Sequence, residues 1–153
     1  MKRLALAILV FVLPAIAQDA KPNFSGTWEL QVAKSDFGPL PPPESVTNTV
    51  DHKEPKLKIT SKSKTMEGDR TTNLNYTTDG EECTNEIQGG PAKSRTRWSD
   101  RELVTEMQLE IQGMKLQFKD RWSLSEDAKT WTIQRAWSGE FGEAAQKLVL
   151  EKK

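Results

Sequence analysis

Hydrophobic and polar residues alternate along most of the chain after about residue 23. In residues 24–32, for example, Phe24, Trp28 and Leu30 share one face while polar residues occupy the other. A period of two is typical of a β-strand with one buried face. The alternation recurs around Val46/Val50, Leu57/Ile59, Leu74/Tyr76, Cys83/Ile87, Thr96/Trp98, Thr105/Met107/Leu109/Ile111, Leu116/Phe118/Trp122/Leu124, Trp131/Ile133/Trp137 and Leu148/Leu150. The pattern predicts about ten strands and almost no helix.

Turn signals separate these segments at intervals of about ten residues, as an antiparallel meander requires. Asp79-Gly80 and Gln112-Gly113 are typical of two-residue hairpin turns, in which both central residues take a positive φ. Pairing outward from the two turns predicts these partners: Tyr76 with Cys83, Thr72 with Ile87, Leu109 with Leu116, and Met107 with Phe118. The turns and the hydrophobic pattern therefore predict the same strand register.

About ten strands with one apolar face can close into a barrel or fold into two stacked sheets. Short connections favour an antiparallel up-and-down β-barrel over a β-sandwich, because a Greek-key sandwich needs long crossovers. The one long connection, residues 34–45, is too rich in proline for a helix and is predicted to form an extended flap or plug.

The first residues resemble a secretory signal peptide. Lys2 and Arg3 precede a run of ten apolar residues, 4–13, and Ala15-Ile16-Ala17 provides a cleavage site. This run is too short to span a membrane. We therefore expect a signal peptide at 1–17 and a single β-barrel domain at 18–153. We also expect an exported protein, periplasmic or extracellular, with no integral membrane segment after cleavage.

The net charge, the single cysteine and the single histidine argue against several classes of function. Cleavage would leave 20 basic and 22 acidic residues, so no overall basic field recruits nucleic acid. The single Cys83 cannot form an intramolecular disulfide, and it is expected to face inward as a small hydrophobic residue. The single histidine, His52, has no cluster of metal-ligating residues beside it in the sequence. No cofactor, metal site or catalytic constellation is expected, and the protein is predicted not to be an enzyme.

Two charged residues fall on inward-facing positions. If Glu126 to Lys129 form a four-residue loop, Asp120 lies directly opposite Arg135. A buried charge without a partner costs several kcal/mol, so the two side chains are expected to pair. The pair could orient the head group of a ligand inside the barrel, or it could only fix the strand register.

The five tryptophans all fall at positions consistent with the barrel interior. Aromatic walls suit flat or apolar ligands, although the same side chains could simply fill the core. The candidate ligand-binding residues on inward faces are Trp28, Tyr76, Phe118, Asp120, Trp122, Arg135 and Trp137.

The segment Phe24-Ser25-Gly26-Thr27-Trp28-Glu29-Leu30 resembles the N-terminal signature of the calycins. That superfamily includes the lipocalins, with Gly-x-Trp, and the fatty-acid-binding proteins, with Phe-x-Gly-Thr-Trp. The stretch Ala33 to Pro39 is also similar to one in small exported bacterial lipocalin-like proteins. The resemblance implies a ligand-binding barrel in which Trp28 packs across the closed end, with Arg135 as the cation against it.

The chain departs from the fatty-acid-binding proteins in two ways. Residues 34–45 cannot form their helix-turn-helix, and no Arg-x-Tyr motif stands near the C-terminus. The lipocalin disulfide is absent as well. We therefore expect an exported, non-enzymatic protein that holds a small apolar or aromatic ligand other than a fatty acid. The alternative is a packed barrel that acts as an interaction module of the cell envelope, with an unknown protein partner and no small ligand.

Overall fold

The computed structural model describes residues 20–140 and 142–153, and the expected signal peptide at 1–17 lies outside them. Ten strands follow one another in these residues, with one 3₁₀ turn, η1 (Val32–Lys34), after the first. The strands are β1 (Gly26–Leu30), β2 (Ser45–Lys53), β3 (Lys56–Thr65), β4 (Gly68–Thr77), β5 (Asp79–Ile87), β6 (Gly90–Ser99), β7 (Glu102–Ile111), β8 (Met114–Leu124), β9 (Thr130–Gly139) and β10 (Gly142–Lys152).

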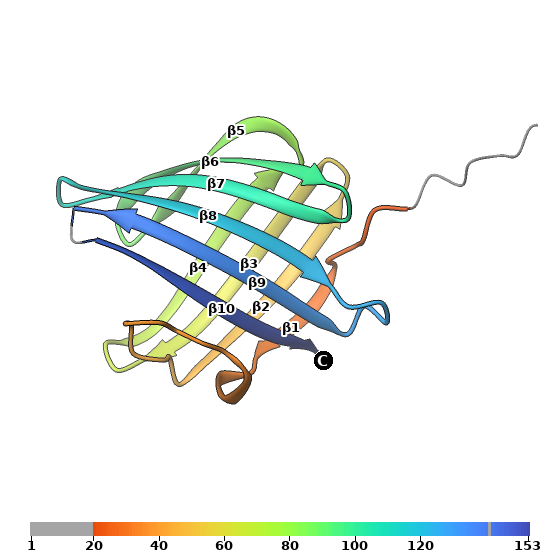
Figure 1. Ribbon diagram of the computed structural model, residues 1–153, viewed down its shortest axis with the longest axis horizontal. Coiled ribbons are helices and arrows are strands. Elements are labelled where there is room, and N and C mark those ends of the chain that lie inside the picture. Colours follow the sequence, from red (N-terminus) through yellow and green to blue (C-terminus); the bar gives the residue numbers. More distant parts are fainter. Residues whose placement is uncertain (1–19, 141) are drawn as a thin grey trace, which may run out of the picture.

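The strands form one antiparallel sheet in the order β4-β3-β2-β1-β10-β9-β8-β7-β6-β5. Each strand pairs with its neighbour in the chain from β1 to β4 and from β5 to β10, and β1 also pairs with β10. In Figure 1, β7 to β10 lie in front while β2 to β4 cross behind them. The prediction of an up-and-down barrel rather than a sandwich is confirmed.

The strand register agrees with the prediction at two connections, the Gln112-Gly113 turn and the loop between β8 and β9. Gln112 and Gly113 have φ angles of 52° and 83°, as a type I′ turn requires. Leu109 consequently pairs with Leu116, as predicted. Beyond the loop after β8, Asp120 lies directly opposite Arg135 on β9, which is also as predicted.

The hairpin predicted at Asp79-Gly80 is wrong, because no backbone ladder joins β4 to β5 in the described residues. The Thr78 N–H donates to Pro55 O at 2.8 Å. The Asp79 carboxylate accepts hydrogen bonds from the Thr77 hydroxyl at 2.9 Å and the Glu81 N–H at 3.1 Å. These contacts direct the chain toward the β2–β3 turn instead of back along β4.

A side chain bridges part of the gap between β4 and β5. The Asn85 carboxamide accepts from the Asn75 N–H at 2.7 Å and donates to the Asn75 carbonyl at 3.0 Å. It therefore replaces, at one point, the pair of backbone hydrogen bonds that a ladder would supply. Cys83, expected to be buried, is only half-buried beside this gap.

The connection from β1 to β2 extends across the open end of the barrel, as a flap. Near its start, Asp36 pairs with Lys147 of β10 through backbone hydrogen bonds of 2.7 and 2.9 Å. Near its end, the Glu44 N–H donates to the Lys64 carbonyl of β3 at 2.9 Å. Next to the Asp36 contact, the Gln146 side chain donates to Phe37 O at 3.0 Å. The flap thus connects β10 to β3 over the barrel opening.

Candidate ligand-binding interior

Large aromatic side chains fill one end of the barrel, which we call the closed end. It lies where the β2–β3, β4–β5, β6–β7 and β8–β9 connections meet. Trp131, 1% exposed, packs edge-on against Phe24, Trp28 and Trp122 at centroid distances of 5.5, 5.8 and 5.4 Å. Trp28 and Trp122, two of the candidate ligand-binding residues, are therefore part of this core.

The cation against Trp28 is not the expected one. Lys152 Nζ lies 5.3 Å from the centroid of the Trp28 ring. Arg135 instead lies over Phe118, with its guanidinium carbon 5.5 Å from the ring centroid. Trp28 pairs with Lys152 across β1 and β10, whereas Arg135 pairs with Gln146, about 20 Å further along β10. The prediction that Arg135 packs against Trp28 is wrong for this reason.

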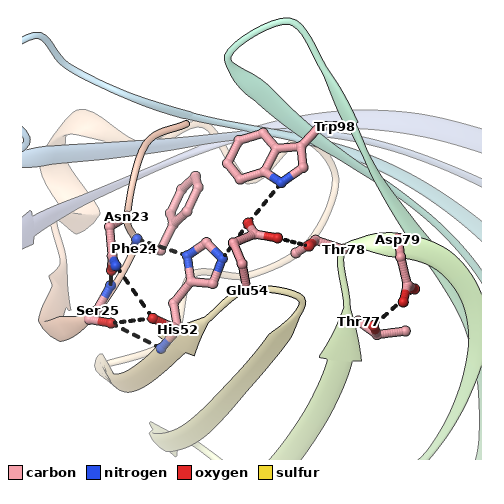
Figure 2. A network of polar contacts seen from close by, with 9 residues as sticks. All are labelled: Asn23, Phe24, Ser25, His52, Glu54, Thr77, Thr78, Asp79 and Trp98. Atoms are coloured by element: carbon pink, nitrogen blue, oxygen red, sulfur yellow. Dashed lines mark hydrogen bonds and ion pairs between the residues drawn. The ribbon is translucent and has the colours of Figure 1, made fainter. Parts of the chain in front are cut away.

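Glu54, in the β2–β3 turn, joins several elements at the closed end (Figure 2). Its carboxylate accepts from Trp98 Nε1 at 2.8 Å, from His52 Nε2 at 3.0 Å, and from the Thr78 hydroxyl. Burial alone would raise the pKa of Glu54, but the hydrogen bonds from Thr78, Trp98 and His52 outweigh it and lower the pKa. The carboxylate therefore stays charged and connects β2 and β6 with the turn between β4 and β5.

His52 is 3% exposed, and both of its ring nitrogens take part in this network. Nδ1 accepts from the Phe24 N–H at 3.2 Å, so the proton is assigned to Nε2, which donates to Glu54. The ring also stacks on Trp98 at a centroid distance of 6.2 Å. His52 is thus a structural residue of the closed end, with no ring nitrogen left for a substrate or a metal.

A row of polar side chains crosses the inner face of β6 to β10 above the aromatic core. Its members are partners in strand register, and we call them the polar belt: Thr96, Thr105, Asp120, Arg135 and Gln146. Thr96 and Thr105 share a buried hydrogen bond of 2.9 Å between their hydroxyls. Of these five, only Asp120 and Arg135 were predicted as site residues, although the inward parity of the other three is equally visible in the sequence.

Asp120 and Arg135 form a bidentate ion pair at the centre of the belt. Arg135 donates from Nε to Oδ1 at 2.8 Å and from Nη2 to Oδ2 at 2.7 Å. Trp122 Nε1 also donates to Oδ2, at 3.4 Å. The Asp120 side chain is 6% exposed and that of Arg135 is 28% exposed. The carboxylate is therefore enclosed, while part of the guanidinium faces the accessible interior.

The environment favours the charged form of Arg135 and the neutral form of Tyr76. Burial alone would lower the pKa of Arg135, but attraction to Asp120 and the hydrogen bonds with it outweigh burial, so the pKa is raised. Burial raises the pKa of the Tyr76 hydroxyl, and the Asp120 carboxylate raises it further. The pair as a whole carries no net charge. Arginine has five N–H groups, so three remain beyond the two that Asp120 accepts.

Above the belt, on the side of the β9–β10 turn, the inward-facing side chains of β2–β4 and β8–β10 are only half-buried. Most inward-facing residues nearer the closed end are buried. We call the half-buried region the open half; its inward-facing residues are Asn48, Ser61, Ser63, Thr72, Leu116, Phe118, Trp137 and Ala144. On β6 and β7 the inner face stays buried further up, at Ala92 and Leu109.

The two sides of the open half differ in polarity. Asn48, Ser61 and Thr72 are register partners across β2, β3 and β4 and make one side polar. On the opposite side, Phe118 and Trp137 pair across β8 and β9. Asn48 Oδ1 and Trp137 Nε1 are buried atoms without a hydrogen-bond partner in the described residues. The open half thus combines an aromatic wall with a polar wall that has hydrogen-bonding capacity to spare.

The seven candidate residues consequently fall into three layers. Trp28, Tyr76 and Trp122 belong to the closed-end core, Asp120 and Arg135 to the belt, and Phe118 and Trp137 line the open half. Two hollows of about 770 and 440 Å³ also lie against β5 to β10. Most of their lining residues point outward, so they belong to the outer wall.

Within residues 20–140 and 142–153, no group of three or more His, Cys, Asp or Glu side chains is placed to hold a metal ion. No helix in the same residues is long and apolar enough to cross a membrane.

No known protein family and no curated protein sequence matches the chain significantly. Several solved structures do match the chain. The zebrafish ileal bile acid-binding protein complexed with cholic acid has a TM-score of 0.61 at 14% identity, covering 85% of this chain and 98% of that one. The fold is that of a calycin-type barrel.

Two further structures support the assignment of the fold. Secretory abundant heat soluble protein 4 from Ramazzottius varieornatus has a TM-score of 0.58 at 12% identity, covering 85% of this chain and 94% of that one. The Schistosoma mansoni fatty acid binding protein, in complex with arachidonic acid, has a TM-score of 0.51 at 12% identity, covering 85% and 96%. At these identities the likeness of the calycin-type barrels is one of fold alone.

Proposed function

We propose that this protein is a carrier that binds a small molecule with an apolar or aromatic body in the open half of its barrel. The observation that carries the proposal is the accessibility of the inner face above the polar belt, where Phe118 and Trp137 are only half-buried. Ligand sites are typically concave and mostly apolar, with a few polar groups that fix orientation. The structural neighbours complexed with cholic acid and arachidonic acid support a carrier function.

The polar belt favours a ligand with a neutral hydrogen-bond acceptor, such as a hydroxyl or carbonyl group. Arg135 has N–H groups left to donate, but Asp120 already neutralises its charge. A carboxylate ligand placed against Arg135 would lie close to the Asp120 carboxylate, and like charges in a partly dry site repel. The absence of the Arg-x-Tyr motif from the sequence agrees with this preference.

A carrier role fits the chemistry better than an enzymatic one. The only histidine of the chain is His52, whose ring nitrogens are both used in structural hydrogen bonds. General acid–base or nucleophilic catalysis would need a titratable group within reach of a substrate. The alternative, a fully packed interaction module, is less compatible with half-buried side chains on the inner walls.

The test is a titration of the purified mature protein with retinol and with retinoic acid, followed by quenching of tryptophan fluorescence. The two probes share one apolar body and differ in a hydroxyl or carboxylate group. We expect saturable binding of retinol, and affinity for retinoic acid weaker by about tenfold. A wider panel of neutral apolar and aromatic compounds extends the test. The absence of saturable quenching by any of them would refute the carrier proposal.

Two substitutions on β9 provide the matched control. Trp137→Leu changes the wall of the open half, whereas Gln134→Leu changes an exposed, outward-facing position on the same strand. We expect Trp137→Leu to weaken binding and Gln134→Leu to leave it unchanged. Equal effects of the two changes would show that the probe binds elsewhere.

The export of the protein is part of the same proposal, and the sequence pattern at 1–17 supports it. Expression of the full chain in a bacterial host, with N-terminal sequencing of the product outside the cytoplasm, tests it. The expected product begins at Gln18 and lies in the periplasm or the medium. An unprocessed chain in the cytoplasm would contradict export without affecting the ligand proposal.

A further inference from the structure

The outer face of β3 carries a line of lysines. Lys56, Lys58, Lys62 and Lys64 occupy alternate, exposed positions of this strand, while Leu57 and Ile59 between them point into the core. Because side chains alternate between the faces of a strand, the lysines project from one face of the sheet. We call these four residues the lysine row.

The lysine row differs from the remainder of the charged outer wall. On β5 to β8, basic side chains pair with glutamates across strands: Arg121 with Glu102 at 2.7 Å, Arg95 with Glu82 at 3.3 Å, and Lys119 with Glu106 at 3.3 Å. In contrast, no lysine of the row has a described carboxylate within 4.0 Å. The positive charge of β3 is therefore only partly compensated: Asp51 lies opposite Lys58 and Asp69 opposite Lys64 in strand register, and neither forms an ion pair within 4.0 Å with it.

The strands on both sides of the row add few acidic groups. The register partners of Lys62 are Thr47 on β2 and Thr71 on β4. The outward carboxylates are Asp51 and Asp69, and Asp51 already contacts Lys53 at 3.6 Å. Lys53 flanks Lys56, and hydroxyl and amide side chains occupy the remaining flanking positions. This face therefore combines excess positive charge with uncharged hydrogen-bonding groups.

The geometry of the row fits an extended chain of negative charges. Neighbouring positions on one face of a strand are about 6.6 Å apart, so Thr60 leaves about 13 Å between Lys58 and Lys62, and Lys56 to Lys64 span about 26 Å. The row is one side chain wide, and the aromatic side chains of β2 to β4 point inward. Stacking of nucleic-acid bases, which single-strand binding exploits, therefore has no platform on this face.

We propose that the lysine row binds a linear acidic polysaccharide, with the lysines contacting its sulfate or carboxylate groups and the flanking threonines its hydroxyls. An anionic membrane fits this face less well, because exposed apolar side chains that would enter the lipid are missing from it. The large hydrophobic residues that are exposed in the described chain, Leu40 and Met66, lie in connections between strands. The proposal is independent of the ligand in the barrel interior.

The experiment measures binding of the mature protein to heparin, as a linear sulfated polysaccharide, by calorimetry at low ionic strength. In the test variant, Lys56, Lys58, Lys62 and Lys64 are all changed to Gln. In the matched control, the paired residues Lys93, Arg95, Arg97 and Lys119 are changed to Gln. Both variants have the same net charge, so a difference in their heparin affinity depends on where on the surface the charges were removed.

We expect the test variant to bind heparin at least about tenfold more weakly than the wild type, and the control to bind within about twofold of it. Raising the salt concentration should weaken wild-type binding. A third variant, in which the four lysines are changed to Arg, should keep its affinity and thereby exclude misfolding as the cause. Absence of heparin binding, equal losses in both Gln variants, or tighter binding to single-stranded DNA or anionic vesicles would each overturn the proposal.

Discussion

The ion pair between Asp120 and Arg135 makes an asymmetric prediction about stability. Two single substitutions remove one partner each: Arg135→Met leaves the carboxylate unpaired, and Asp120→Leu leaves the guanidinium unpaired. The Asp120 side chain is 6% exposed and that of Arg135 is 28% exposed. The carboxylate left behind therefore has little access to water, whereas the guanidinium can turn toward the open half.

This difference in exposure determines how much each substitution lowers the free energy of unfolding. An uncompensated buried charge costs about 3 to 5 kcal/mol, so we expect Arg135→Met to lower the free energy of unfolding by about 3 kcal/mol. Asp120→Leu should cost about 1 to 1.5 kcal/mol, because Arg135 regains part of its hydration. Combining the two removes both charges and adds apolar contact with Phe118, so the double variant should lie within about 1 kcal/mol of the wild type.

The assay is urea unfolding of the mature protein, with the wild type and the three variants measured at neutral pH. For a domain of this size, 1 kcal/mol corresponds to about 4 °C in Tm, so thermal scans should show a fall of about 12 °C for Arg135→Met. A larger loss for Asp120→Leu than for Arg135→Met would contradict the reasoning from exposure. A double variant no more stable than the weaker single variant would show that the pair does not act as a unit.

Three further outcomes follow from the hydrogen bonds and turns. The folded-state pKa of Glu54 lies below its ordinary value of 4.5, so its contribution is present above that value and is lost as the pH falls through the folded pKa. Glu54→Gln should therefore lower the urea midpoint at pH 7, and its difference from the wild type should shrink as the pH falls below 4.5. Asn85→Leu leaves the backbone groups of Asn75 unpaired, so it should cost about 1 kcal/mol and speed hydrogen exchange at the Asn75 amide. Gly113 has a φ of 83°, and Gly113→Ala should lower Tm by about 4 °C because alanine is strained there.

Register could be predicted from the sequence where a turn is governed by its own residues. Gln112 and Gly113 both adopt a positive φ in a two-residue turn, and the adjoining hairpin follows from that local preference. The opposition of Asp120 and Arg135 follows in the same way from the length of the loop between β8 and β9. Such features need no knowledge of distant parts of the chain.

The errors of prediction arise where distant residues compete with a local preference. At Asp79-Gly80 the sequence favours a hairpin, but Pro55 and Glu54, far away in the chain, accept the hydrogen bonds of Thr78 instead. Arg135 was predicted to lie against Trp28 because both residues fall on inward-facing positions. The alternation along a strand shows which face a residue is on, but not how far along the barrel axis it lies. Only the pairing of β1 with β10, which joins the two ends of the domain, places Lys152 against Trp28.

The distribution of side-chain size explains why a core and an accessible interior coexist in one barrel. A barrel of eight strands is just wide enough to be filled by side chains, and ten strands enclose more space. Trp28, Trp122 and Trp131 fill that width at the closed end. Above the belt, β3 contributes Ser61, Ser63 and Thr65 to the inner face, and these side chains are too small to meet the opposite wall. The tryptophans therefore pack one half of the interior, and the small residues of β3 keep the other half accessible to a ligand.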